Sequence, residues 1–145
     1  MFKVKLIKAE MTYDLRHKVL RPFLTIEDCK YETDFEENTF HVGGFYKGQL
    51  VSIVSFVTDI HPDFSYKNQY RLRAMATLDD YRKLGAGRAV VEFGEEILRE
   101  RGTEFLWCKG RTSVQEYYRR LGFTPYGEIF DYPPTGLHIV MYKIL

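Results

Sequence analysis

The chain has 145 residues, and 21 Lys and Arg against 20 Asp and Glu leave a formal net charge of +1 at pH 7. So balanced a charge argues against the strongly basic surface that binds nucleic acid or an anionic membrane. The hydrophobic fraction of 45% and the aromatic fraction of 16% exclude a disordered chain. The length predicts a single domain over residues 1–145 with a substantial core.

The first third of the chain predicts a strand, a helix and a turn-rich loop. Val4–Ala9 alternates as a strand does, and Thr12 can cap a helix that ends near Leu20, before Pro22. The segment 28–38 has turn residues and no apolar periodicity, which predicts a loop. Its carboxylates are those of Asp28, Glu32, Asp34, Glu36 and Glu37. We expect these charges to be solvated rather than to attract a cationic amine or polyamine.

The rest of the chain predicts strands interrupted by two helices. The predicted strands are residues 39–46, 50–58, 70–78, 103–108, 123–130 and 137–144. A long amphipathic helix follows Gly87 and ends before Gly102, and a capping box at Ser113–Glu116 predicts a second helix to Leu121. Residues 60–67 contain Pro62 and predict a flexible connection that could border a substrate site. This order of elements predicts an α/β or α+β fold with a partly antiparallel sheet.

No apolar run approaches the roughly 20 residues of a membrane span, and the N-terminal residues alternate Lys with apolar side chains, unlike a signal peptide. We therefore expect a cytoplasmic protein with no membrane partner. Cys29 and Cys108 are too few for a disulfide framework and lack metal-type spacing. Both are expected to be free thiols, and no metal is expected.

The most informative segment is Arg82-Lys83-Leu84-Gly85-Ala86-Gly87, which joins a predicted strand to the long helix. The first N–H groups of a helix have no intrahelical partner, and the helix dipole adds positive charge there, so the segment predicts a phosphate site. Gly85 and Gly87 lack Cβ atoms, which allows unusual dihedrals and a close approach of the ligand. The segment is not a P-loop, because no Gly-Lys-Ser/Thr follows, and it fits a dinucleotide fingerprint poorly.

Two motifs resemble those of the GNAT superfamily of N-acetyltransferases. Arg82-x-x-Gly85-x-Gly87 is similar to its Arg/Gln-x-x-Gly-x-Gly/Ala loop, and Tyr117-Tyr118-Arg119-Arg120-Leu121-Gly122-Phe123 is similar to the segment that ends its core. The resemblance extends from about Val4 to Leu145. It implies the GNAT fold, a mixed and mostly antiparallel twisted sheet of six to seven strands flanked by about four helices, and an enzyme that uses acetyl-coenzyme A as co-substrate.

The resemblance also implies which residues contact the coenzyme. The main chain near Met75, Ala76 and Thr77 would supply donors to the oxyanion, and Tyr118 would face the coenzyme sulfur. Arg111 stands where many family members have a coenzyme-contacting Asn, and an Arg could reach phosphate instead. The implied coenzyme-binding residues are Met75, Ala76, Thr77, Arg82, Lys83, Leu84, Gly85, Ala86, Gly87, Arg88, Arg111 and Tyr118.

The group that deprotonates the acceptor amine is harder to find, because the strand 70–78 has no Asp or Glu where many family members carry one. Segments 15–22, 39–41 and 137–141 resemble a bacterial GNAT subgroup with largely unassigned substrates, although Leu137 replaces the Pro of that subgroup. His41 and His138 are therefore candidates for both base catalysis and acceptor binding, and a structural role is the alternative for each. Arg73 could anchor an acidic substrate, or be a solvated charge.

The function expected from these features is transfer of an acetyl group to a primary amine by direct attack in a ternary complex. A small-molecule amine is favoured over a protein tail, and a homodimer is left open. The alternative is a non-catalytic acyl-coenzyme A-binding or sensing domain, which retention of Tyr118 argues against and the missing strand carboxylate argues for. A nucleotide-binding regulatory fold is a third interpretation.

Overall fold

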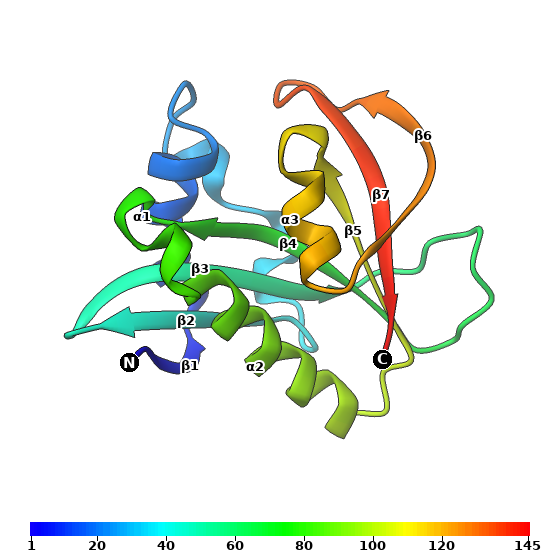
Figure 1. Cartoon of the computed structure of the whole chain (residues 1–145), viewed down its shortest axis with the longest axis horizontal. Helices are drawn as coiled ribbons and strands as arrows, with labels where there is room; N and C mark the ends of the chain where they lie inside the picture. Colours follow the sequence, from blue (N-terminus) through cyan, green and yellow to red (C-terminus); the bar gives the residue numbers. More distant parts are fainter.

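The computed structural model describes residues 1–145, and its seven strands form one sheet in the order β1-β2-β3-β4-β5-β7-β6 (Figure 1). The strands are β1 (Lys3–Ile7), β2 (Phe40–Tyr46), β3 (Gln49–Thr58), β4 (Gln69–Thr77), β5 (Phe105–Arg111), β6 (Thr124–Asp131) and β7 (Leu137–Ile144). All neighbouring strands are antiparallel except β4 and β5, which are parallel. The predicted mixed, mostly antiparallel sheet is confirmed.

One face of the sheet is covered by α2 (Ala86–Glu100) and α3 (Gln115–Arg120) (Figure 1). The buried stripe of α2 includes Val90, Val91 and Leu98, which share the main core with side chains of β2 to β5 and β7. A Cβ at Gly94 would collide with the ring of Phe56, so this glycine allows α2 to pack closely on β3. No helix combines the length and apolarity required to cross a membrane.

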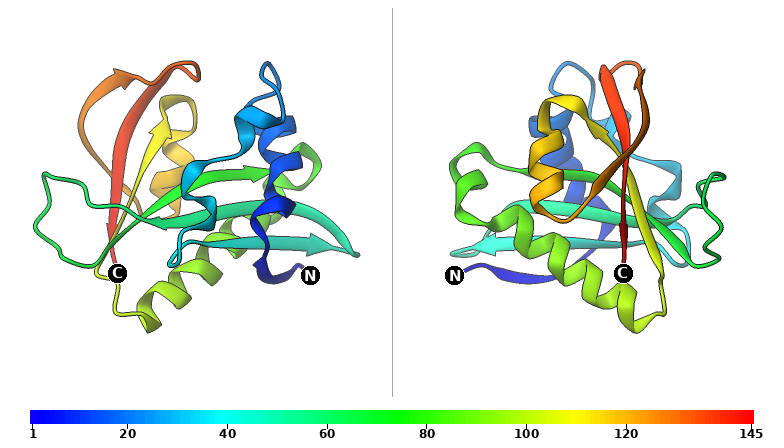
Figure 2. Two further views of the ribbon diagram at one scale, coloured as in Figure 1. Left: turned by 180° about the vertical axis from the view of Figure 1, so that it is seen from behind. Right: turned by 45° about the vertical axis from the view of Figure 1, so that its right-hand side comes forward.

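The opposite face is covered by an N-terminal helical segment, residues 9–20, which lies in front of the sheet when the molecule is seen from behind (Figure 2). It consists of the 3-10 turn η1 (Ala9–Thr12), a short α1 (Tyr13–Leu15) and the π-helical η2 (Arg16–Leu20). Buried Leu15 packs against Ile53 of β3 and Ala76 of β4. The predicted cap is wrong, because the Thr12 hydroxyl donates to the Ala9 carbonyl at 2.6 Å instead of accepting from a helix N–H.

The segment 28–38 is a turn-rich loop as predicted, and it contains parts of two 3-10 turns, η3 (Glu27–Cys29) and η4 (Glu32–Phe35). Two further local predictions are not met. The capping box at Ser113 does not form, because the 3-10 turn η6 (Thr112–Val114) occupies the approach to α3 and no side chain caps it. The connection at residues 60–67 does not line the cleft described below. Its aromatic side chains pack instead on β5, where the His61 ring lies 5.0 Å from Trp107 and the Phe64 ring 4.5 Å from Phe105.

Candidate active site

A cleft opens where the two parallel strands separate. β4 and β5 pair only over residues 69–71 and 105–107, and beyond them the strands diverge (Figure 1). In β4, Ala74 has a φ of 50° and the pairing with β3 shifts register, so the strand is bulged beside the opening. The resulting cleft has a volume of about 880 Å³, which is in the range of cofactor and ligand sites. Met75, Ala76 and Thr77 line it directly after the bulge.

One end of the cleft is the N-terminus of α2. Gly85 has a φ of 88°, which ends η5 (Asp79–Leu84) and starts α2. The Ala89 N–H donates to the Gly85 carbonyl at 3.0 Å, so the amides that precede Ala89 have no partner within the helix. Arg82, Lys83 and Arg88 line the same end of the cleft. This end can bind an anion through its backbone, its dipole and its cationic side chains.

The second glycine of the loop makes a packing contact that its sequence position did not indicate. A Cβ at Gly87 would collide with the hydroxyl of Tyr117, and Gly87 does not line the cleft. Leu84 and Ala86 do not line it either. Gly87 is therefore required for the contact between α2 and α3, whereas Gly85 supplies the unusual dihedral.

Tyr118 projects from α3 into the same cleft and is only 8% exposed. Its ring packs against Gly110 of β5, where a Cβ would lie 3.2 Å from the ring. Burial raises the pKa of Tyr118 far above the usual value near 10, with smaller contributions from Cys108 and Tyr117. The phenol is therefore protonated throughout the neutral pH range and can act as a hydrogen-bond donor.

His138 of β7 also lines the cleft, and its environment determines its tautomer. Nδ1 lies 2.8 Å from the carbonyl oxygen of Gly136. Because a carbonyl can only accept, Nδ1 carries the proton and Nε2 keeps a free lone pair. Burial lowers the pKa of His138 below 6.5, and the charges of Arg111 and Lys109 lower it further. His138 is therefore a neutral base at neutral pH.

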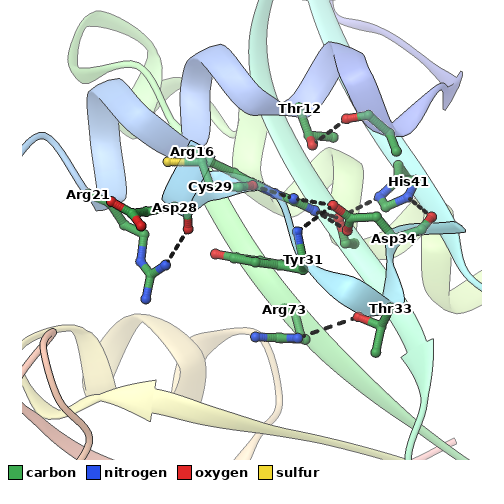
Figure 3. A network of polar contacts seen from close by, with 12 residues as sticks. Thr12, Arg16, Arg21, Asp28, Cys29, Tyr31, Thr33, Asp34, His41 and Arg73 are labelled. Atoms are coloured by element: carbon green, nitrogen blue, oxygen red, sulfur yellow. Dashed lines mark hydrogen bonds and ion pairs between the residues drawn. The ribbon is translucent and has the colours of Figure 1, made fainter. Parts of the chain in front are cut away.

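His41, the other candidate base, does not line the cleft. Its Nδ1 lies 2.7 Å from Ser55 Oγ, and its Nε2 lies 3.0 Å from the carbonyl oxygen of Asp34. Both ring nitrogens thus have partners in a buried polar network (Figure 3). The geometry distinguishes the two histidines: His138 lines the cleft, and His41 is part of the structure that supports the loop at residues 27–36.

The centre of this network is a buried ion pair that the sequence did not predict. Nη1 and Nη2 of Arg16 donate to the Asp34 carboxylate, at 2.8 and 2.9 Å, and Arg16 also donates to the Cys29 carbonyl and to Ser55 (Figure 3). Asp34 is 4% exposed and Arg16 is fully buried. The expectation that the loop carboxylates are solvated is therefore wrong for Asp34, which attaches the loop to the N-terminal helical segment.

We expect Asp34→Asn to lower the free energy of unfolding by about 3 kcal/mol, because it leaves the Arg16 charge buried without a counter-ion. Urea denaturation at pH 7 measures the change. Glu37→Gln, at an exposed position of the same loop, is the matched control and should change stability by less than about 0.5 kcal/mol. Equal stability of the two variants would contradict the assignment of Asp34.

The same pair should make stability depend on pH in the acid range. Although burial alone would raise it, hydrogen bonds from Arg16 and from the Tyr31 N–H, together with the Arg16 charge, lower the pKa of Asp34. Its contribution is therefore present above the unfolded value near 3.9 and disappears as the pH falls through the lower folded value. Denaturation between pH 2 and 7 should show the wild type and Asp34→Asn converging in stability toward the acid end.

Arg73 and Arg111 both line the cleft, at positions that the sequence had singled out. Arg73 stacks on the Tyr31 ring at 4.3 Å and donates to the Thr33 hydroxyl at 3.5 Å, so it is partly buried rather than freely solvated. Arg111 donates to the Leu20 carbonyl at 2.7 Å and thereby links β5 to the N-terminal helical segment. Its role toward phosphate remains a prediction.

Several residues that line the cleft were not identified from the sequence: Tyr31, Arg71, Lys109 and Tyr132. Tyr31 lies in the segment 28–38, whose sequence predicts a solvated loop. Lys109 lies beyond the predicted end of its strand at Cys108. A signal was available for Arg71, because alternation along a strand places Arg71 and Arg73 on one face and Leu72 on the other. Tyr132 had no comparable signal.

The class of the protein follows from three features of the cleft. β4 is bulged, its parallel partner β5 diverges from it, and α2 begins at a glycine at the opening. The chain belongs to the Acetyltransferase (GNAT) family, whose model matches residues 9–123. Along its full length the chain is 47% identical to the Bacillus subtilis (strain 168) protein named Uncharacterized N-acetyltransferase YitI, and it covers 97% of that relative.

Solved structures show the same fold at low sequence identity. The ribosomal-protein-S18-alanine N-acetyltransferase of Escherichia coli aligns with a TM-score of 0.76 and 17% identity, over 99% of this chain and 94% of that one. An aminoglycoside 6'-N-acetyltransferase complexed with coenzyme A aligns with a TM-score of 0.76 and 14% identity, over 98% and 96% of the two chains. The two enzymes have unrelated acceptors, so the fold alone does not identify the acceptor here.

Proposed function

We propose that the protein transfers the acetyl group of acetyl-coenzyme A to a primary amine by direct attack in a ternary complex. The observation that carries this proposal is the placement of a hydrogen-bond donor, Tyr118, and a neutral base, His138, in one cleft that ends at the N-terminus of α2. The acceptor is proposed to be a small molecule, since the base and the bulged strand lie inside a cleft.

The residues along the cleft fit coenzyme A. The N-terminus of α2, with Gly85, Arg82, Lys83 and Arg88, would hold the pyrophosphate. The bulge at Ala74 shifts the register of β4 against β3, and β5 has diverged from the other edge of β4, so that a backbone amide near 75–77 could face the thioester oxygen and would stabilise the negative charge that develops there. The bound coenzyme would supply the activated acetyl group, and these residues would orient it.

His138 would remove the proton of the acceptor amine. An alkylamine with a pKa near 10.4 is mostly protonated at pH 7, and it must lose a proton before or during attack. The Nε2 lone pair can accept that proton while Nδ1–H remains bonded to Gly136. The histidine therefore has the same kind of orienting hydrogen bond that fixes the tautomer of other catalytic histidines.

Tyr118 would stabilise the departing thiolate. A thiol has a pKa near 8.5, so its thiolate is a weaker base than the phenolate of Tyr118, whose pKa is raised by burial. Full transfer of the proton from Tyr118 to sulfur is then uphill. A charge-assisted hydrogen bond from the hydroxyl to the thiolate requires no such transfer and is the contribution we assign to Tyr118.

Two glycines at the two ends of α2 offer a matched test of the coenzyme site. Gly85 and Gly102 have φ values of 88° and 77°, and both have open space where a Cβ would lie. Either Ala variant should therefore lose about 1–2 kcal/mol of stability through the left-handed backbone. Only Gly85→Ala should weaken coenzyme A binding in calorimetry, by about 10-fold, because it disturbs the amides that face the phosphates. An equal effect of Gly102→Ala would contradict the site.

The absence of Asp and Glu from β4 favours a second candidate, an acyl-coenzyme A sensor without catalytic activity. Thiol release from acetyl-coenzyme A in the presence of an amine panel, with product detected by mass spectrometry, separates the two. Amine-dependent release with formation of an acetamide supports the transferase. Tight coenzyme binding without release across the panel supports the sensor and contradicts the proposed function.

A further inference from the structure

The cleft has a strongly asymmetric charge. Nine of its lining residues are Arg or Lys, and none is Asp or Glu. The formal net charge of the whole chain is only +1, so this excess of positive charge is local to the cleft. The cations near α2 are accounted for by the coenzyme phosphates, but the cleft has further cations on its other side.

Arg73 and Lys109 are two of the cations that line the cleft away from the α2 end. The last paired residues of β4 and β5 are Arg71 and Trp107, so Arg73 and Lys109 stand two residues further along the two diverging strands. Side chains alternate along a strand, which places both on the face of Trp107. The intervening Leu72 and Cys108 face the core that contains α2. The pair therefore belongs to the side of the cleft that faces the loop at residues 27–36.

Neither of these charges is neutralised. The ion pairs of the structure include neither Arg73 nor Lys109. The contrast with Arg16 is direct: the Tyr31 ring stacks on Arg16 at 4.2 Å and on Arg73 at 4.3 Å, but only Arg16 has the Asp34 carboxylate (Figure 3). Two unpaired cations in a partly buried cleft are electrostatically costly, and an anionic ligand would remove that cost.

The side chain of Tyr132 lies among the positive charges of this part of the cleft. Lys109 Nζ lies 4.7 Å from the centre of its ring, and Arg71 donates to its hydroxyl at 3.4 Å. Although burial alone would raise it, this hydrogen bond and the charges of Arg71, Lys109 and Arg73 lower the pKa of Tyr132 below its usual value. Cations from β4 and from β5 thus act together on Tyr132. This place is close to His138, whose ring lies 5.1 Å from that of Tyr132.

We propose that the acceptor is a primary amine that also carries a carboxylate or phosphate, and that Arg73 and Lys109 bind this anionic group. The inference rests on the proposed acetyl transfer and specifies its substrate class. A polyamine would be repelled by the same charges. The positive field would also favour the neutral form of the amine next to His138, which is the form that attacks.

Matched acceptor pairs test the class directly. Amino acids are compared with their amides, and glucosamine 6-phosphate with glucosamine, with spermidine as the cationic probe. We expect kcat/KM for the acidic members of at least one series to exceed that of their neutral counterparts by about 10-fold or more. The series that responds distinguishes a carboxylate from a phosphate. Equal or better turnover of the neutral partners or of spermidine would overturn the inference while leaving acetyl transfer intact.

Two variants test the residues. Arg73→Met and Lys109→Met keep the length and apolar contact of the side chain but remove its charge. Each should raise KM for the acidic acceptor by about 10- to 100-fold with a smaller change in kcat, and should change KM for the neutral counterpart much less. Lys67→Met, at an exposed position outside the cleft, is the control and should change KM for neither the acidic nor the neutral acceptor. An unchanged preference in both cleft variants would contradict the assignment.

A binding measurement keeps this inference separable from the proposed function. The same acidic and neutral compounds are titrated calorimetrically into the coenzyme A-loaded protein and into its Arg73→Met variant. Arg73-dependent binding of the acidic compounds without turnover would sustain the anion site and contradict acetyl transfer. Turnover without any Arg73-dependent preference would support acetyl transfer and contradict the anion site. The absence of both turnover and selective binding would contradict the anion site and acetyl transfer alike.

Discussion

His138→Asn should lower kcat/KM by about 100- to 10,000-fold at neutral pH, the range that a positioned general base contributes. The substitution is chosen because the amide of Asn can still donate to the Gly136 carbonyl, as His138 Nδ1 does at 2.8 Å, while the base at Nε2 is lost. Initial rates of thiol release, at saturating and limiting amine, measure the change. His61→Asn, outside the cleft, is the control and should retain activity.

The pH profile provides a second test of His138 that a purely structural role would not alter. The base acts in its neutral form, and burial together with Arg111 and Lys109 lowers its pKa. Activity of the wild type should therefore fall on the acid side as the pH drops through a value below about 6.5. In His138→Asn, assayed with the same amine, this acid limb should be absent. A variant that keeps both the rate and the limb would show that another group takes the proton.

Tyr118→Phe should lower kcat by about 100- to 1,000-fold, the effect of removing one preorganised donor from developing charge. The Kd for coenzyme A should change much less, because the ring that packs against Gly110 is retained. Raising the pH through the neutral range should produce no loss of activity from ionisation of Tyr118, since burial raises its pKa far above that range. Steady-state kinetics and calorimetry on the same preparations provide both quantities.

The control for Tyr118→Phe is Tyr142→Phe, which removes a phenolic hydroxyl from β7 at a position that does not line the cleft. The Tyr142 ring stacks on Phe105 at 5.6 Å, and that contact remains in the variant. Its kcat should stay close to that of the wild type. If Tyr118→Phe behaves like Tyr142→Phe, the thiolate has another donor and the role given to Tyr118 is wrong.

Secondary structure followed the sequence wherever local preferences and burial agree. The strand at 137–144 was predicted with its exact bounds, and α2 was located by its apolar stripe and by Gly102 beyond its end. Where polar side chains form hydrogen bonds across the molecule, local patterns failed. Thr12 bonds back to Ala9, and Asp34 is drawn out of solvent by Arg16, which precedes it by 18 residues.

The candidate site shows the same division. The glycine loop and Tyr118 could be located from short motifs, since each depends on backbone dihedrals or on neighbours within one helix turn. His41 and His138 were equivalent as sequence positions. The tertiary structure separates them, because β2 carries His41 into the network with Ser55 and Asp34, whereas β7 places His138 in the cleft beside β5.

The sequence by itself determined the order of the elements and the resemblance to the GNAT family, and it predicted an anion site at the start of α2, all of which depend on residues close together in the chain. Only the tertiary structure decided which cations have partners. Arg16 and Arg73 stack on the same Tyr31 ring, and the fold supplies a carboxylate to one and not to the other. The physical reason is that charge neutralisation depends on distances between strands and loops, which no local pattern encodes.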